Sequence, residues 1–308
     1  MRYRHNPGSM AFDVANHLLF LLLIVSFIFP FVYIFSVSIS GYAEITLNAV
    51  KLFPKGELHL NSYRILLMAT NIGIAYVNSV LYAVFTVILT LLVTSAAAFA
   101  LERQSLPFRK VILVFIVLTM FVPTNMIPSF LVIMGIGLYN TRLAIILPAC
   151  FSAWYIFIMR ANIRSTIGAD LREAAYMDGA GDLYVYLRIV LPLIKPILAT
   201  IGLFAAVESW NNYAGPLIYL TDAAKFPLPL ILQRILLEGR VGRYTGSFQS
   251  NLQSGPLRDI SLEGWVGPGF FKSFKFAAII LTIWPIVVVY PFIQRYFVKG
   301  VLVGSVKD

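Results

Sequence analysis

The 308-residue sequence has few charged residues and almost no cysteine or histidine. Charged residues make up 12% of the chain and apolar residues 59%, whereas a soluble domain has roughly 25% charged residues. This composition excludes a soluble globular enzyme, and the abundant apolar surface excludes a disordered chain. The single cysteine, Cys150, excludes an internal disulfide framework, and the scattered His5, His17 and His59 do not indicate a zinc site.

Nucleotide-binding and catalytic motifs are also missing. The sequence has no G-x-x-x-x-G-K-[ST] phosphate loop, so the chain should not hydrolyse ATP itself. It has no G-x-S-x-G elbow, and its apolar stretches hold no His–Cys or paired-carboxylate set. We therefore expect no enzyme and no metal site. The net charge of +10 indicates basic loops beside lipid headgroups, not a nucleic-acid-binding face.

Long stretches without charge dominate the sequence instead. A membrane helix needs about 20 mainly apolar residues, and six stretches provide this, one of them interrupted by Glu208. We predict an all-α integral membrane protein with a single transmembrane domain over residues 1–308. The expected spans lie near 18–38, 74–101, 111–135, 143–160, 197–220 and 275–295.

The distribution of basic residues indicates the orientation. Six spans place both termini on one side, together with the segments that follow the second and fourth spans. These end and loop segments carry more than half of the Lys and Arg residues, which favours the cytoplasmic side for them. Both termini and the loop 161–196 are therefore predicted to be cytoplasmic, and the long loop 222–274 to be extracytoplasmic.

The loop 161–196 has a pattern of short helices. Asp170 and Glu173 have capping-box spacing, so a helix is predicted to begin near Leu171 and to end at Gly179. Asp182 is predicted to cap a second helix that ends at Pro192. Its apolar residues recur at helical spacing and predict one buried face: Leu183, Tyr186, Leu187 and Val190. Two such helices form a knob that could fill a groove on a partner.

The ordered residues of this loop resemble the EAA loop of bacterial ABC importer permeases. They are Glu173-Ala174-Ala175, Asp178-Gly179-Ala180, Ile189, Leu191-Pro192 and Pro196. The full-length pattern is similar to carbohydrate-uptake permeases of the maltose-permease type, in the subgroup for oligosaccharides and polysaccharides. Further matching residues are Ala98 to Leu101 with Arg103, Trp210-Asn211, Pro216-Leu217, and the tail from Lys299 to Lys307. Asn212 departs from the pattern, because the family often has an acidic residue there.

This resemblance implies the type I ABC importer permease fold and a role for each matching loop residue. Glu173 would face an ATPase subunit, Ala174 and Ala175 would allow its close approach, and Gly179 would set the bend. The other residues implied in ATPase coupling are Arg172, Asp178, Ala180, Arg188, Leu191 and Pro192. The alternative is that Asp170, Glu173 and the glycines only cap and end helices.

The resemblance also implies the partners. They are a second, homologous permease subunit in a heterodimer, two ATPase subunits that carry ATP and Mg²⁺, an extracytoplasmic solute-binding protein, and an oligosaccharide. The location would be the bacterial inner membrane. An importer of another solute, such as a peptide or an amino acid, and an ion-coupled secondary carrier remain alternatives.

Residues at the end of the fifth predicted span suggest a translocation path. Glu208 is the one acid within a span, where a charge costs about 2.5–3.5 kcal/mol on insertion scales. The aromatic and amide side chains that follow suit sugars: Trp210, Asn211, Asn212 and Tyr213. Alternatively, the amides bond neighbouring helices and the aromatics mark the membrane interface.

The outer loop 222–274 is polar, glycine-rich and basic. By resemblance it would face the solute-binding protein and reach towards its ligand. Its candidate residues are Arg234, Arg240, Arg243, Tyr244 and Arg258. Because the planar guanidinium donates two parallel hydrogen bonds to a carboxylate, these arginines could meet an acidic protein surface or an anionic glycan of the uronate or alginate type. The alternative is solvated charges or headgroup contacts.

Overall fold

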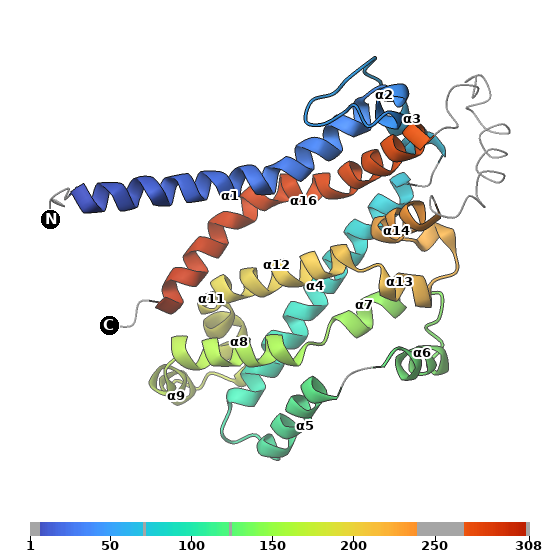
Figure 1. Ribbon diagram of the computed structural model, residues 1–308. Coiled ribbons are helices and arrows are strands. Elements are labelled where there is room, and N and C mark those ends of the chain that lie inside the picture. The colour runs from blue at the N-terminus through green and yellow to red at the C-terminus, as the bar shows by residue number, and fades with distance from the viewer. Residues whose placement is uncertain (1–6, 70–71, 123–124, 239–267, 306–308) are drawn as a thin grey trace. The chain divides into compact units, whose positions relative to one another are not determined.

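The computed structural model describes residues 7–69, 72–122, 125–238 and 268–305, and all elements within these ranges are helices (Figure 1). The prediction of an all-α protein is confirmed. In chain order the helices are α1 (Pro7–Ile39), α2 (Tyr42–Thr46), α3 (Asn61–Ala69), α4 (Ile72–Glu102), α5 (Arg109–Phe121), α6 (Met126–Gly135), α7 (Leu143–Ala149), α8 (Ala153–Thr166), α9 (Ala169–Met177), α10 (Asp182–Tyr184), a π-helical turn (Val185–Val190), α11 (Leu191–Leu193), α12 (Lys195–Asn211), α13 (Ala214–Tyr219), a 3₁₀ turn (Ala223–Lys225), α14 (Leu228–Glu238) and α16 (Pro268–Ser305).

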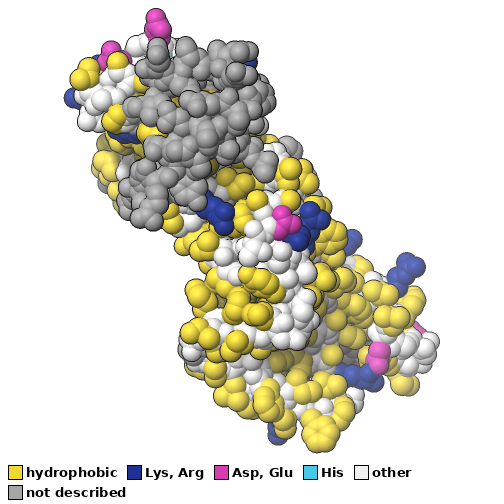
Figure 2. Space-filling view, turned by 90° about the vertical axis from the view of Figure 1, so that its right-hand side faces the viewer, with side chains coloured by type: hydrophobic (Ala, Val, Ile, Leu, Met, Phe, Trp, Pro, Cys, Tyr) yellow, Lys and Arg dark blue, Asp and Glu magenta, His cyan; other side chains and the backbone are white. Residues whose placement is uncertain are grey.

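Several helices are long and apolar enough to cross a membrane. Three single helices meet this requirement, namely Met10–Ile39, Ile72–Glu102 and Pro268–Val288. Two more candidates are bent pairs, α7 with α8 at 45°, and Asp182–Leu193 with α12 at 79°. Figure 2 shows apolar side chains over much of the described surface on the side in view, as lipid contact requires.

The region 111–135, predicted as one span, contains two helices, α5 and α6. Val122, directly after α5, is extended with φ −90° and ψ 105°, as expected for a residue that precedes a proline. Pro128 lies in the first turn of α6, where its missing N–H has no intrahelical acceptor to lose. The sequence predicted one helix over this uncharged stretch, and the structure divides it into two.

The chain divides into two compact units, residues 1–71 with 234–284, and residues 72–233 with 285–308. In the first unit, α1, α3 and α16 are joined by buried serines. Ser62 and Ser273 share a hydrogen bond of 2.8 Å between their hydroxyls, and Ser273 also bonds the Ser38 carbonyl at 2.9 Å. An added Cβ at Gly269 would lie 2.1 Å from the Tyr42 carbonyl oxygen, so α16 approaches α2 through a position that only glycine permits.

In the second unit, α4 is the central helix, packed against α8 and α12. Its buried face repeats every four residues and consists of small and polar side chains, among them Thr86, Thr90, Thr94 and Ala98. Small side chains allow close helix contact in membranes. The adjoining core cluster joins α4, α8, the π-helical turn and α12: Ala98, Met159, Ile163, Ile167, Val185, Val190, Ile194 and Ile201.

Candidate functional site

Helix α9, which carries the Glu-Ala-Ala motif, begins earlier than predicted. Its first residue is Ala169 and its N-cap is Gly168, with φ −56° and ψ 155°. The prediction that Asp170 caps a helix starting near Leu171 is therefore wrong. The cause is the preceding residue, Ile167, which is extended and 1% exposed in the core cluster. Burial of this side chain ends α8 and leaves a turn of only two residues before α9.

The end of α9 agrees with the prediction. Gly179 has φ +81°, the left-handed region that favours glycine. The Ala180 N–H donates to the Ala175 carbonyl at 3.0 Å, and the Gly179 N–H donates to the Tyr176 carbonyl at 3.0 Å. This pair of bonds is the Schellman motif, which satisfies the last carbonyls of a helix. Gly179 thus sets the bend that the sequence indicated.

The face of α9 that turns away from the core carries part of the motif. Glu173, Ala174 and Asp178 are exposed, and Met177 is 88% exposed. Ala175 lies on the other side, half-buried against the core cluster. The motif therefore has two parts, because Glu173 and Ala174 are accessible to a partner whereas Ala175 holds the helix on its own subunit. The side chain of Arg172 lies outside the described residues.

The second helix of the loop differs from its prediction. Its N-cap is Gly181, and Asp182 is its first helical residue. Val185 and Val190 are fully buried, whereas Leu183 and Leu187 are 68% and 48% exposed. The reason is the π-helical turn, whose wider winding brings residues five apart onto one face. The predicted face assumed α-helical spacing and is correct only in part, because Val190 and the half-buried Tyr186 lie inward whereas Leu183 and Leu187 do not.

The remaining ATPase-coupling candidates of the loop lie in this π-helical turn or directly after it. Arg188 is exposed, Leu191 is half-buried against the core cluster, and Pro192 is exposed. The helix continues past Pro192 to Leu193, then bends at Ile194 into α12. Pro192 therefore does not end the helix as predicted; it lies within the last turn of the continuous helix Asp182–Leu193.

A cluster around Asp182 joins the loop to the end of α4. The Arg103 guanidinium forms an ion pair with the Asp182 carboxylate. The Tyr176 hydroxyl donates to Asp182 Oδ1 at 2.9 Å, and the Arg103 guanidinium carbon lies 5.8 Å from the centre of the Tyr176 ring.

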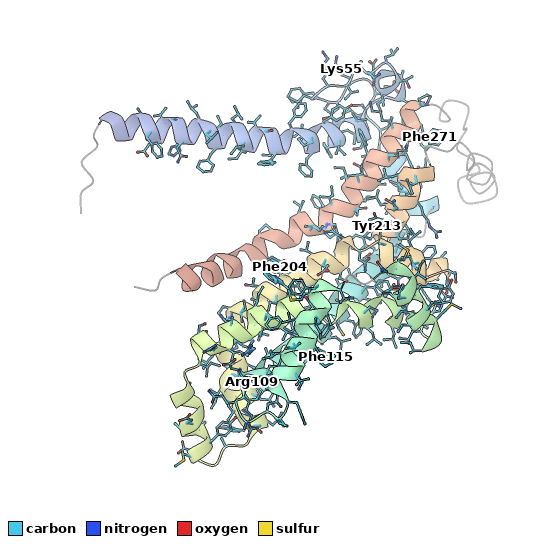
Figure 3. All side chains as sticks on the ribbon, turned by 60° about the horizontal axis from the view of Figure 1, so that its bottom comes forward. Lys55, Arg109, Phe115, Phe204, Tyr213 and Phe271 are labelled. Carbon is cyan, nitrogen blue, oxygen red and sulfur yellow. The ribbon has the colours of Figure 1, made fainter. Side chains whose placement is uncertain are left out.

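A second polar cluster lies at the same helix end. Glu102 is 7% exposed and accepts a hydrogen bond of 3.0 Å from Arg160 Nε of α8. Arg109, labelled in Figure 3, places Nη2 4.0 Å from the same carboxylate oxygen and donates from Nε to the Leu101 carbonyl at 2.8 Å. The sequence candidates did not include Glu102, Arg160 or Tyr176, although charges of opposite sign at the ends of two neighbouring spans were a signal for the pair.

The residues proposed for the translocation path do not share one surface. Glu208, Asn211 and Tyr213 are exposed; Figure 3 labels Tyr213. Trp210 is 8% exposed and packs edge-to-face on Tyr76 of α4, with ring centroids 5.8 Å apart. Asn212 is half-buried, and its Oδ1 accepts the Gly215 N–H at 3.1 Å where the chain turns into α13.

Two of these side chains are notable for their polar atoms. The Tyr155 hydroxyl of α8 donates to Glu208 Oε2 at 3.1 Å. The buried Trp210 Nε1 has no hydrogen-bond acceptor among the residues that the structure describes.

Of the outer-loop candidates, the structure describes one: Arg234, which lies half-buried on α14. The other four candidates, Arg240, Arg243, Tyr244 and Arg258, lie outside the described residues.

Apolar helices long enough to cross a membrane, with a structured polar loop between two of them, are typical of a multi-pass membrane protein. Residues 93–303 match the family of binding-protein-dependent transport system inner membrane components, and the chain belongs to this family. Its members are permeases of the inner membrane, transporters rather than enzymes, that work with a solute-binding protein and ATPase subunits in ABC importers. The predicted type I importer permease fold is confirmed, and the match favours an importer over an ion-coupled carrier.

Individual relatives extend over nearly the whole chain. The polygalacturonan/rhamnogalacturonan transport system permease protein YtcP of Bacillus subtilis is 32% identical over 296 residues, 96% of this chain and 98% of the relative. The arabinooligosaccharides transport system permease protein AraQ of the same organism is 27% identical over 309 residues, 99% of each chain. A chain in the crystal structure of a bacterial ABC transporter involved in the import of the acidic polysaccharide alginate has a TM-score of 0.81 and 30% identity, and the match covers 96% of this chain and 99% of that one.

Proposed function

We propose that this permease subunit serves the import of acidic oligosaccharides built from uronic acids. The observation that carries the proposal is the match over 96% of the chain, at a TM-score of 0.81, to a subunit of the alginate importer. The similarity to a polygalacturonan/rhamnogalacturonan permease points in the same direction, because both polymers contain uronic acids. Arg240, Arg243 and Arg258 of the loop 222–274 would bind the sugar carboxylates or the acidic surface of the solute-binding protein.

The exposed face of α9 is the proposed docking site for an ATPase subunit. Met177 is a large apolar side chain that is 88% exposed on a predicted cytoplasmic loop, beside the acidic Glu173 and Asp178. A docked ATPase subunit would cover this methionine and could pair its own basic side chains with the two carboxylates. Two such ATPase subunits would bind ATP and Mg²⁺, and a second, homologous permease would complete the assembly. Both termini of this chain would lie in the cytoplasm.

Co-purification tests the docking site. The complex is isolated in mild detergent from the native host, and the bound proteins are identified by mass spectrometry. Glu173→Arg should abolish recovery of the ATPase, because it reverses the charge at the centre of the exposed face. Glu57→Arg, a reversal of another exposed glutamate far from α9 in sequence, is the matched control and should leave recovery unchanged. Equal recovery from the wild type and the Glu173→Arg variant would contradict docking through this face.

The substrate class is tested with the recovered complex and its solute-binding protein in proteoliposomes. Trigalacturonate should be taken up faster than the neutral arabinotriose. Replacing Arg240 and Arg243 by alanine should reduce trigalacturonate uptake more than arabinotriose uptake, because only the acidic sugar needs a cationic partner. Uptake of arabinotriose alone would show that the substrate is a neutral oligosaccharide and would overturn the proposal.

A further inference from the structure

Two neighbouring residues at the end of α4 hold both arms of the loop that carries α9. Glu102 binds Arg160 on α8, the arm that leads into α9, with a distance of 3.0 Å from Nε to Oε2. Arg103 binds Asp182, the first residue of the arm that leads out of α9. Glu102 is the last residue of α4 and Arg103 directly follows it, so one helix end holds two different arms. The lower end of α4 in Figure 1 lies beside α8 and α9, as these contacts require.

The connection to Asp182 also includes α9 itself. Tyr176, near the C-terminal end of α9, donates its hydroxyl to Asp182 Oδ1 at 2.9 Å. Its ring also faces the Arg103 guanidinium at 5.8 Å. The three side chains Arg103, Tyr176 and Asp182 are called the clasp below. They connect the end of α4, the end of α9 and the start of the outgoing arm.

The backbone around α9 would permit movement without such a connection. Gly168 precedes α9, and Gly179 and Gly181 follow it. An added Cβ would meet nothing within 4 Å at any of the three positions. The turns on both sides of α9 are therefore not held by packing at these residues. The packing of Ala175 on the core cluster and the clasp together fix the direction of α9 relative to α4.

The exposure of the clasp indicates that it contributes little to the stability of the fold. The side chains of Arg103 and Asp182 are 47% and 48% exposed. Ion pairs with this much exposure contribute little to the free energy of unfolding. The buried pair of Glu102 and Arg160 and the core cluster provide the stability of this region instead. Loss of the clasp should therefore leave the subunit folded and assembled.

We propose that Arg103, Tyr176 and Asp182 are positioning residues that make α9 and the C-terminal end of α4 move as one body. The inference rests on the proposed docking of an ATPase subunit on α9. A movement of the ATPase would then be passed directly to α4, whose buried face lies against α8 and α12. Without the clasp, bending at the glycine turns would absorb part of that movement, and ATP would be hydrolysed with less transport.

The test measures the distance between α4 and α9 in the complete complex, in nanodiscs. Spin labels are placed at Gln104→Cys, an exposed position just after α4, and at Leu171→Cys, where the side chain is 47% exposed on α9 itself. Cys150→Ser removes the native thiol. The distance distribution is recorded by pulsed electron paramagnetic resonance, first without nucleotide and then after trapping with ATP and vanadate. Neither state requires the sugar.

With the clasp intact, the two states should give the same mean distance and width. Asp182→Asn, Arg103→Gln and Tyr176→Phe should each broaden or shift the distribution on trapping, while ATP hydrolysis continues. The exchanged pair, Arg103→Asp with Asp182→Arg, should restore the narrow distribution, which a purely structural role of either residue would not predict. Asp222→Asn is the matched control, since Asp222 forms a similarly exposed pair with Lys225 at 3.3 Å outside the loop.

The possible failures are distinguishable. If the wild-type chain is isolated without an ATPase, the proposed docking is wrong and the clasp inference falls with it. If the ATPase is recovered but the clasp variants and the wild type give the same distributions, only the clasp inference is wrong. A distance that changes on trapping in the wild type would also overturn it.

Discussion

Tyr155 of α8 and Glu208 of α12 form a hydrogen bond of 3.1 Å between the phenol hydroxyl and Oε2 of the carboxylate. Both helices belong to bent pairs that are long and apolar enough to cross a membrane. Glu208 is nevertheless exposed on the surface of this chain. An exposed carboxylate in a span is unfavourable against lipid, so this side chain should face a water-filled path or another subunit.

The first prediction concerns this carboxylate. Glu208→Gln keeps the shape of the side chain and its bond to Tyr155 but removes the charge. We expect normal expression with a lower rate of trigalacturonate uptake, measured in proteoliposomes at equal protein. Tyr155→Phe should have a smaller effect in the same direction, because the charge remains. Unchanged uptake by Glu208→Gln at normal expression would remove Glu208 from the translocation path.

The second prediction concerns the buried pair at the end of α4. Arg160→Gln leaves the Glu102 carboxylate 7% exposed, with Arg109 at 4.0 Å as its remaining cation among the described residues. Removing one partner of a buried pair typically lowers the free energy of unfolding by about 3–5 kcal/mol. We therefore expect a large fall in the thermal unfolding temperature in detergent. The double variant Glu102→Gln with Arg160→Gln should recover most of it; an equally unstable double variant would show that the guanidinium acts through packing instead.

These pairs mark the limit of what the sequence could predict. Uncharged stretches predicted helices because a chain in lipid must satisfy its backbone hydrogen bonds internally, and α1, α4 and α16 lie where the apolar stretches placed them. The pair Arg160 and Glu102 is 58 residues apart, and the pair Arg103 and Asp182 is 79 residues apart. Such contacts depend on how the helices pack, and no local pattern specifies them.

Local sequence signals also failed to predict where the two loop helices begin, because tertiary packing determines these positions. Asp170 and Asp182 both looked like helix caps, but Gly168 and Gly181 occupy the N-cap positions. Burial of Ile167 determines where α9 begins. The Asp182 carboxylate binds Arg103 and Tyr176 instead of capping a helix. Gly179 was predicted correctly, because a glycine that follows a short helical pattern has a conformational reason to be there.

The third prediction compares two glycines of this bend. Gly179→Ala forces a Cβ into the left-handed region at φ +81°, which costs roughly 1–2 kcal/mol for an L-residue. Gly181→Ala is the control, since φ is −77° there and neither position has a neighbour within 4 Å of an added Cβ. We expect Gly179→Ala to weaken recovery of the ATPase in the co-purification assay and Gly181→Ala to leave it unchanged. Equal effects would contradict a role for the left-handed backbone of Gly179 in docking.

The fourth prediction concerns His59, which lies outside the candidate spans. Its ring is 4.0 Å from the Tyr42 ring, centroid to centroid, and neither ring nitrogen has a hydrogen-bond partner among the described residues. Burial lowers the pKa of His59 below its usual value of 6.5, because the charged form loses hydration. The unfolded chain therefore binds a proton at a higher pH than the folded chain does.

The sign of the pH dependence follows from this difference. Stability rises with pH wherever the unfolded state binds more protons. The folded state should therefore lose stability as the pH falls through the usual value of 6.5 and stop losing it once the pH is below the lowered pKa. Thermal unfolding of the detergent-solubilised subunit between neutral and mildly acidic pH measures the change. His59→Gln, which cannot be protonated, should remove this part of the dependence, and a variant with the same pH profile as the wild type would show that another group is responsible.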